Sequence, residues 1–256
     1  MTGDGTSVRT TFAAQLEVLS SSVDRLAALV HSLTPEQLRQ RAYPSEWKVA
    51  DVLSHLGSGA VITRGRLEGE VDMQAVWNEW NAKDPDAQAA DALAADAALQ
   101  LRLAALTPEE QEQLRFAMGP MELDLATFLG MRISEHALHT WDVAVTFDQA
   151  ATVPSDAASL VVDNLAMMAP FAGKPTGTDR VFTVRTTEPT RQFELALRPD
   201  SVTLVPSESA GDAPDLELSA DGLIRLVYGR LDPDHTPTVR GSATDLDELR
   251  RAFPGF

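Results

Sequence analysis

The sequence of 256 residues predicts two domains of different fold classes, an all-α domain at residues 1–151 and a small α+β domain at residues 152–256. In the first half, apolar residues recur at helical spacing over long segments, whereas the second half contains short segments of alternating polar and apolar residues. The segment Thr152-Val-Pro154 interrupts the helical pattern. It places the domain boundary near residue 151.

Turn signals divide the first half into four expected helices, which together form a four-helix bundle. Each turn contains a proline: Thr34-Pro35, Pro44-Ser45, Asp84-Pro85 and Thr107-Pro108. We expect helices at residues 8–33, 45–68, 85–106 and 121–148, with Ser45 as the N-cap of the second. The third is rich in alanine, the residue with the highest helix propensity.

The second half begins with an expected helix at residues 155–170 and a loop at residues 171–178. Alternating segments predict strands at residues 180–186, 192–198, 201–205 and 215–219. A helix at residues 222–230, a strand at residues 238–241 and a helix at residues 243–253 follow. Strands and helices segregated in this way are typical of the α+β class.

The composition excludes several functional classes. A net charge of −17 argues against binding to nucleic acid or to anionic membranes, since both require basic patches. The chain has no apolar run long enough for a membrane span, and its first residues lack the features of a secretory signal, so we expect a cytoplasmic protein. Because there is no cysteine, any thiol chemistry must use the sulfur of a small molecule.

Glu135 and His139 lie one helical turn apart in the expected helix at residues 121–148. Residues at this spacing project from the same face of a helix. A carboxylate and an imidazole are costly to bury unless a positive charge lies between them, and a divalent metal supplies that charge. Because two ligands do not complete a site, a third ligand must come from another element.

His55, within the expected helix at residues 45–68, is the candidate third ligand. The chain contains five histidines, at positions 31, 55, 136, 139 and 235. The residues alone also allow His55 to be an ordinary structural histidine and the other two candidates to form a solvated contact. If all three bind one ion, three protein ligands leave an open coordination position of the kind found in catalytic zinc sites.

Several neighbouring residues have two interpretations. Asp142 either accepts a hydrogen bond from a ligating imidazole or is exposed, and Asp51, one turn before His55, can play the first role toward that histidine. His136 is rotated by about 100° from its neighbour Glu135, so we expect it to point between helices, and a pair of His136 with His139 is the alternative. The tryptophans at positions 77 and 80 either line a pocket or simply pack.

Two segments resemble a known family. A tryptophan-led helix with Val49-Ala-Asp-Val-Leu-Ser-His-Leu56, followed by Glu135-His-Ala-Leu-His-Thr-Trp-Asp142, is similar to the mycothiol-dependent maleylpyruvate isomerase family of the DinB superfamily. The resemblance covers nearly the whole chain. It implies a DinB-like four-helix bundle in which His55, Glu135 and His139 bind zinc, and a second domain resembling sterol carrier proteins.

The resemblance also implies an enzyme that uses mycothiol, a low-molecular-weight thiol, to attack a small electrophile. A thiol bound to zinc reacts as the thiolate. The thiolate adds to the double bond of a cis-enedioate, rotation follows, and elimination gives the trans isomer; S-transfer to an electrophile is the other reaction of the wider family. Zinc is the expected metal, although two histidines and a glutamate also suit iron, nickel or manganese.

The segment Leu223-Ile-Arg-Leu-Val-Tyr-Gly-Arg-Leu231 resembles an apolar helix of the same family that ends in aromatic-Gly-Arg. Gly229 is a natural helix terminator. The resemblance implies that Arg230 faces the cleft between the domains and binds a substrate carboxylate. A surface arginine is the competing interpretation, and Tyr228 stands where the family usually has tryptophan.

Two other functions remain open at this point. One is a metal-dependent hydrolase that uses zinc-bound water, and the other is a non-enzymatic protein that binds a small ligand in an apolar cavity of the second domain. In each case the expected partners are small molecules, with no nucleic acid and no membrane, and the expected assembly is a monomer or a weak homodimer.

Overall fold

The computed structural model describes residues 11–119, 121–208 and 213–255. The chain forms two compact units, Met1–Ala151 and Thr152–Phe256, each of which is described by itself. None of the helices in the described part of the chain is long and apolar enough to cross a membrane.

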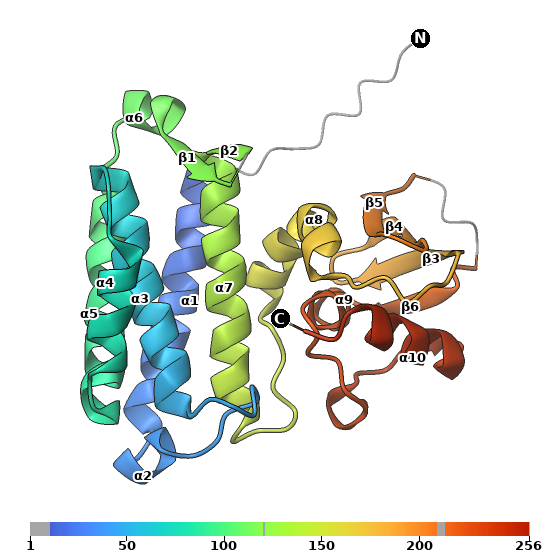
Figure 1. Ribbon diagram of the computed structural model, residues 1–256, viewed down its shortest axis with the longest axis horizontal. Coiled ribbons are helices and arrows are strands. Elements are labelled where there is room, and N and C mark those ends of the chain that lie inside the picture. The colour runs from blue at the N-terminus through green and yellow to red at the C-terminus, as the bar shows by residue number, and fades with distance from the viewer. Residues whose placement is uncertain (1–10, 120, 209–212, 256) are drawn as a thin grey trace. The chain divides into compact units, whose positions relative to one another are not determined.

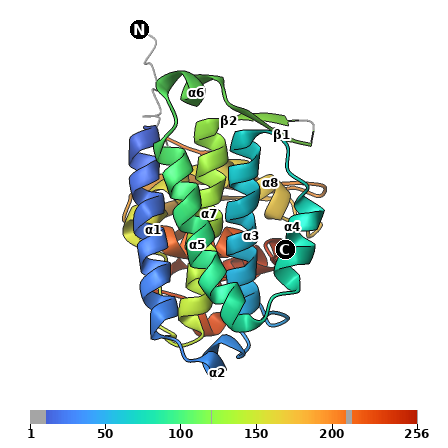
Figure 2. The same ribbon diagram turned by 90° about the vertical axis from the view of Figure 1, so that its left-hand side faces the viewer.

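The first unit is a bundle of four long helices. They are α1 (Phe12–Ser32), α3 (Val49–Glu68), α5 (Pro85–Ala104) and α7 (Leu125–Val145), connected by the short helices α2 (Pro35–Leu38), α4 (Met73–Asn81) and α6 (Pro108–Gln113). Helices α1 and α3 each pack against both α5 and α7, so the four enclose one core (Figure 1). Helices α3 and α5 run in the same direction, and α4 makes the return crossing between them (Figure 2). The predicted four-helix bundle is confirmed.

Helices α3 and α5 approach each other closely at Gly57. A Cβ atom at this position would lie 2.2 Å from the ring of Trp80 and 2.8 Å from the Cα of Ala92, so only glycine fits. Trp80 is 3% exposed and fills the core beside this contact, whereas Trp77 is 41% exposed. Of the two interpretations of Trp80, packing is therefore correct.

The expected start of the second long helix is wrong. We expected the helix from residue 45 with Ser45 as its N-cap, but α3 begins at Val49. The Asp51 carboxylate accepts a hydrogen bond from the backbone N–H of Lys48 at 2.8 Å, and this contact defines the helix start. Asp51 therefore caps its own helix, and among the described residues its carboxylate makes no hydrogen bond with His55.

The expected start of the fourth long helix is also wrong. Residues 121–124 form strand β2 (Met121–Asp124), which pairs with β1 (Arg115–Met118) in an antiparallel hairpin. Helix α7 begins after it, where Asp124 accepts a hydrogen bond from the N–H of Thr127 at 2.8 Å. Residues 8–10 of the first expected helix lie outside the described residues.

The second unit is a five-stranded sheet with helices packed on it, which confirms the α+β class. Its strands lie in the order β5-β4-β3-β6-β7, and only the β3–β6 pair is parallel. The strands are β3 (Arg180–Thr187), β4 (Arg191–Leu197), β5 (Val202–Pro206), β6 (Leu216–Ser219) and β7 (Arg240–Gly241). Helix α8 (Ser155–Ala172) packs against β5 and α9 (Ala220–Val227), α9 packs against β3 and β6, and α10 (Ala243–Ala252) follows β7. The last strand is shorter than the expected residues 238–241.

A buried charged cluster joins α3, α5 and α7. The Arg132 guanidinium donates hydrogen bonds to the Asp96 carboxylate at 2.8 Å and to the Leu56 carbonyl at 2.9 Å, and His136 Nε2 lies 3.1 Å from the other Asp96 oxygen. Burial raises the pKa of Asp96, but the hydrogen bond with His136 and the charge of Arg132 outweigh it and lower this pKa below its usual value. The carboxylate is therefore ionised and holds the three helices together.

We expect Asp96→Ala to lower the free energy of unfolding by about 3–5 kcal/mol, because it leaves the Arg132 charge buried without its partner. Asp91→Ala on the same helix is the control. Asp91 is half-exposed and pairs with Lys83 at 2.9 Å, so its loss costs at most about 1 kcal/mol. Urea denaturation of the two variants measures the difference, and equal effects would show that the buried cluster does not stabilise the bundle.

Candidate metal centre

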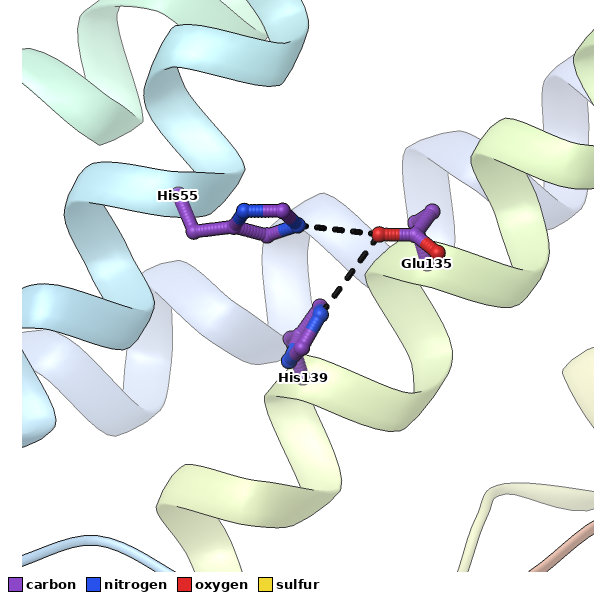
Figure 3. A group of neighbouring side chains, drawn as sticks. All are labelled: His55, Glu135 and His139. Carbon is purple, nitrogen blue, oxygen red and sulfur yellow. Dashed lines mark hydrogen bonds and ion pairs between the residues drawn. The ribbon is translucent and has the colours of Figure 1, made fainter. Parts of the chain in front are cut away.

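His55, Glu135 and His139 lie together, as the sequence predicts. His55 projects from α3 and the other two from adjacent turns of α7 (Figure 3). The Glu135 Oε2 atom lies 3.0 Å from His55 Nε2 and 3.5 Å from His139 Nε2. The candidate ligand atoms of all three residues lie within 4.8 Å of one another, and no other such group of three occurs among the described residues.

This donor set fits a divalent metal ion. Tetrahedral coordination with bonds of about 2.0–2.1 Å separates neighbouring ligand atoms by about 3.4 Å. The nitrogen-to-oxygen distances of 3.0 and 3.5 Å are close to that value. The side chains of His55 and Glu135 are 40% and 45% exposed, so a small molecule can reach the centre of the group.

Asp142 orients the ring of His139. Its carboxylate is fully buried and lies 2.8 Å from His139 Nδ1, which leaves Nε2 directed at Glu135 (Figure 3). Burial lowers the pKa of His139, but the hydrogen bonds with Asp142 and Glu135 outweigh it and raise the pKa above its usual value. Of the two interpretations of Asp142, the structure excludes the exposed aspartate. A carboxylate on the far nitrogen is the usual partner of a metal-ligating histidine.

Glu135 is held in its ionised form. Burial raises the pKa of its carboxyl group, but the hydrogen bonds and charges of His139 and His55 outweigh this effect and lower the pKa far below its usual value. An ionised carboxylate is the form that binds a metal. The three side chains therefore have the charge and geometry that a divalent metal ion requires.

Comparisons with known proteins agree with the resemblance seen in the sequence. Residues 19–144 match the family described as mycothiol maleylpyruvate isomerase N-terminal domain. These residues of the first unit therefore carry the N-terminal domain of this family. The matched region contains all three residues of the candidate centre and most of the bundle.

Two crystal structures share the fold of the chain. One is of the mycothiol-dependent maleylpyruvate isomerase, and the other is of a histidine-to-alanine mutant of that enzyme. Each is 12% identical to this chain, with a TM-score of 0.63 over 86% of this chain and 90% of the other. At 12% identity the likeness shows a common fold. Because it covers 86% of this chain, the shared fold includes part of the second unit as well as the first. Among curated proteins, no sequence match was found.

Trp47 is a site residue that the sequence did not single out. Its ring centroid lies 5.3 Å from that of His55 and 5.9 Å from that of His139, to which it is nearly parallel. Trp47 precedes α3, and its apolar character alone is equally consistent with packing in the core. Its place at the head of the family-like motif was the only signal in the sequence that links it to the metal centre.

The other histidines of the described chain lie outside the centre. His136 is completely buried and contacts Asp96, and burial lowers its pKa below the usual value. It points between helices, as expected. His31 is exposed at the end of α1, and His235 lies 2.8 Å from an Asp232 oxygen in the second unit.

Arg230 lies three residues beyond the end of α9, because the helix ends at Val227 and not at residue 230 as expected. Gly229 has φ 70°, and a Cβ atom there would lie 2.2 Å from the backbone nitrogen of Gly255, so glycine is required at this turn. The Arg230 guanidinium donates a hydrogen bond to the Tyr228 carbonyl at 3.0 Å and is half-buried. These contacts fix the residue locally, and its role toward a substrate stays a prediction.

We expect His55→Ala protein to lose its metal during dialysis against a mild chelator, because the variant retains only two of three ligands. His31→Ala is the matched control, since His31 is exposed and far from the centre in sequence and on another helix. Elemental analysis by mass spectrometry gives the metal bound per chain. Stoichiometric metal in the His55→Ala protein would show that His55 is not a ligand.

Proposed function

We propose that this protein is a metal-dependent enzyme that activates mycothiol for attack on a small electrophile, as a cis–trans isomerase of the maleylpyruvate type. The observation that carries the proposal is the cluster of His55, Glu135 and His139 within a domain of the mycothiol maleylpyruvate isomerase family. The chain contains no cysteine, which supports a thiol supplied by a cosubstrate. Zinc is the metal proposed.

The chain's own residues prepare the centre for an anionic sulfur. His55, Glu135 and His139 would hold a divalent ion with two neutral imidazoles and one carboxylate, for a net charge of +1, and the bound ion would supply the acidification that converts a thiol to its thiolate. Asp142 keeps the His139 ring in place through its 2.8 Å contact. The Trp47 ring packs beside both imidazoles, at centroid distances of 5.3 Å from His55 and 5.9 Å from His139.

Isomerisation uses the thiolate as a catalyst that is regenerated. The sulfur adds to one carbon of the cis double bond, and the electron pair of that bond moves onto the conjugated carbonyl as an enolate. Rotation about the new carbon–carbon single bond follows. The pair then returns and expels the thiolate, which restores the double bond in the trans form. No oxidant or reductant is required, and no thiol is consumed.

We expect conversion of maleylpyruvate by the metal-loaded protein to require mycothiol and to leave its concentration unchanged. Chromatography of substrate, product and thiol follows the reaction, and Glu135→Gln protein serves as the metal-deficient control. Mycothiol must also raise the melting temperature of the metal-loaded protein, because it binds only the folded state. Turnover without thiol would identify a hydrolase, and lasting consumption of thiol would identify an S-transferase; either result contradicts the isomerase.

We further propose that Arg230 binds a substrate carboxylate, since the required glycine before it fixes its backbone and a guanidinium pairs well with a carboxylate. Arg230→Ala should leave the metal content unchanged. It should lower kcat/KM for an acidic substrate by about 30-fold to several thousand-fold, the equivalent of about 2–5 kcal/mol. Arg251→Ala, which removes an exposed arginine of the same unit, is the control. Normal turnover by Arg230→Ala would exclude this role.

A further inference from the structure

Three aromatic rings pack against one another at the candidate metal centre. The centroid of the Trp47 ring lies 5.9 Å from that of His139, with the two rings nearly parallel, and 5.3 Å from that of His55 at an angle of 46°. The two imidazoles meet edge to face at 4.6 Å. All three separations fall within the range in which aromatic rings attract each other. Trp47 therefore contacts both of the imidazoles that offer ligand atoms.

The two imidazoles differ in what else holds them. Nδ1 of His139 lies 2.8 Å from the Asp142 carboxylate, and this contact fixes the orientation of that ring. His55 has the contact of its Nε2 with Glu135, but no hydrogen bond from the described part of the chain reaches its Nδ1. The His55 side chain is also 40% exposed. The orientation of its ring therefore depends on the rings that pack against it.

The plane of the His55 ring decides whether its nitrogen can serve as a ligand. The lone pair of an imidazole nitrogen lies in the plane of the ring, and a precise site tolerates deviations of only about 10–20°. Because a metal ligand must give up the proton on the coordinating nitrogen, the hydrogen bond between Nε2 and Glu135 cannot hold the ring once an ion binds. A flat surface packed against the ring still restricts its plane. Trp47 offers such a surface.

Contacts that do not involve the candidate ligands hold Trp47 in place. Its N–H donates a hydrogen bond to the Pro44 carbonyl at 2.8 Å, and its own carbonyl accepts one from the Ala42 N–H at 2.9 Å. A bridge between Arg41 and Lys48 closes the same loop just before α3 begins. The Trp47 side chain is half-buried and packs against the apolar core of the bundle. Its ring is therefore a fixed support for the imidazoles.

We propose that Trp47 is a positioning residue of the centre, whose ring sets the plane of the His55 imidazole and supports that of His139, so that both Nε2 atoms face Glu135. The positioning itself rests on the ring contacts, whereas its consequence for a bound ion rests on the proposed function. One imidazole is then held by a carboxylate and the other by an aromatic surface. His55 should depend on Trp47 more strongly than His139 does, because only His139 has Asp142.

The zinc affinity of the full chain, measured by competition with a chromophoric chelator, tests the proposal. Trp47→Leu keeps an apolar side chain but removes the flat surface. It should raise the dissociation constant for zinc about tenfold, the lower end of the effect of losing an outer partner of a metal ligand. Trp47→Phe restores a flat ring and should recover most of the affinity. Trp77→Leu, which removes an exposed tryptophan of α4, is the control and should bind zinc as the wild type does.

Crystal structures of the metal-free proteins show the positioning directly. In Trp47→Leu the His55 ring should turn away from Glu135, while the contact between His139 and Asp142 remains. If Trp47→Leu does not fold, Trp47→Met provides the same comparison with a longer and flexible apolar side chain.

Two results would overturn the proposal: an unmoved His55 ring in Trp47→Leu, or equal zinc affinities of Trp47→Leu and the wild type. Either result would do so even if the variant melts at a lower temperature, because apolar packing in the core alone predicts that change. Wild-type protein that binds no zinc would refute the proposed function. A displaced His55 ring in metal-free Trp47→Leu would still support the positioning role in that case.

Discussion

The packing of α3 against α7 is the contact on which the candidate centre depends. It places the His55 ring 3.0 Å from a carboxylate oxygen of Glu135, although the two residues are 80 positions apart in the chain. Helix geometry alone brings Glu135 and His139 together, because residues four apart share a face. His55 Nε2, the third candidate ligand atom, joins the group only when α3 and α7 pack with one particular axial offset. A slide of one helix by a single turn, about 5.4 Å, would remove it from the group.

The buried cluster of Arg132, Asp96 and His136 is suited to setting that position. Apolar side chains of similar volume can stabilise a bundle equally well, but their contacts tolerate sliding. The hydrogen bonds of the cluster are directional, and one of them ends on the carbonyl of Leu56, the residue after His55. Asp96 belongs to α5. This helix can lie close to α3 because Gly57 has no side chain, and Asp96 can therefore reach the cluster. The charges therefore give the helices a defined register as well as cohesion.

Sequence patterns correctly predicted the elements whose residues follow a regular spacing. They failed at positions where contacts between distant segments determine the structure. The bundle, the sheet domain and the three candidate ligands follow from helical spacing, strand alternation and scarce histidines. The β1–β2 hairpin was missed because Leu123 and Leu125 fit both a helical and a strand pattern, and only pairing with β1 decides between them. The partner of His139 was uncertain because burial of Asp142 cannot be read from its position.

The strongly acidic composition sets a condition on any anionic substrate. With a net charge of −17, the average field of the chain repels such a molecule, so binding must come from local positive groups. Screening limits the repulsion to about 8 Å at physiological salt, whereas contacts inside a partly closed cavity are screened much less. A divalent ion held by His55, Glu135 and His139 would give a centre of net charge +1 that outweighs the surrounding acids at short range. Any preference for acidic electrophiles must therefore arise from positive charge at the site itself and not from the field of the whole chain.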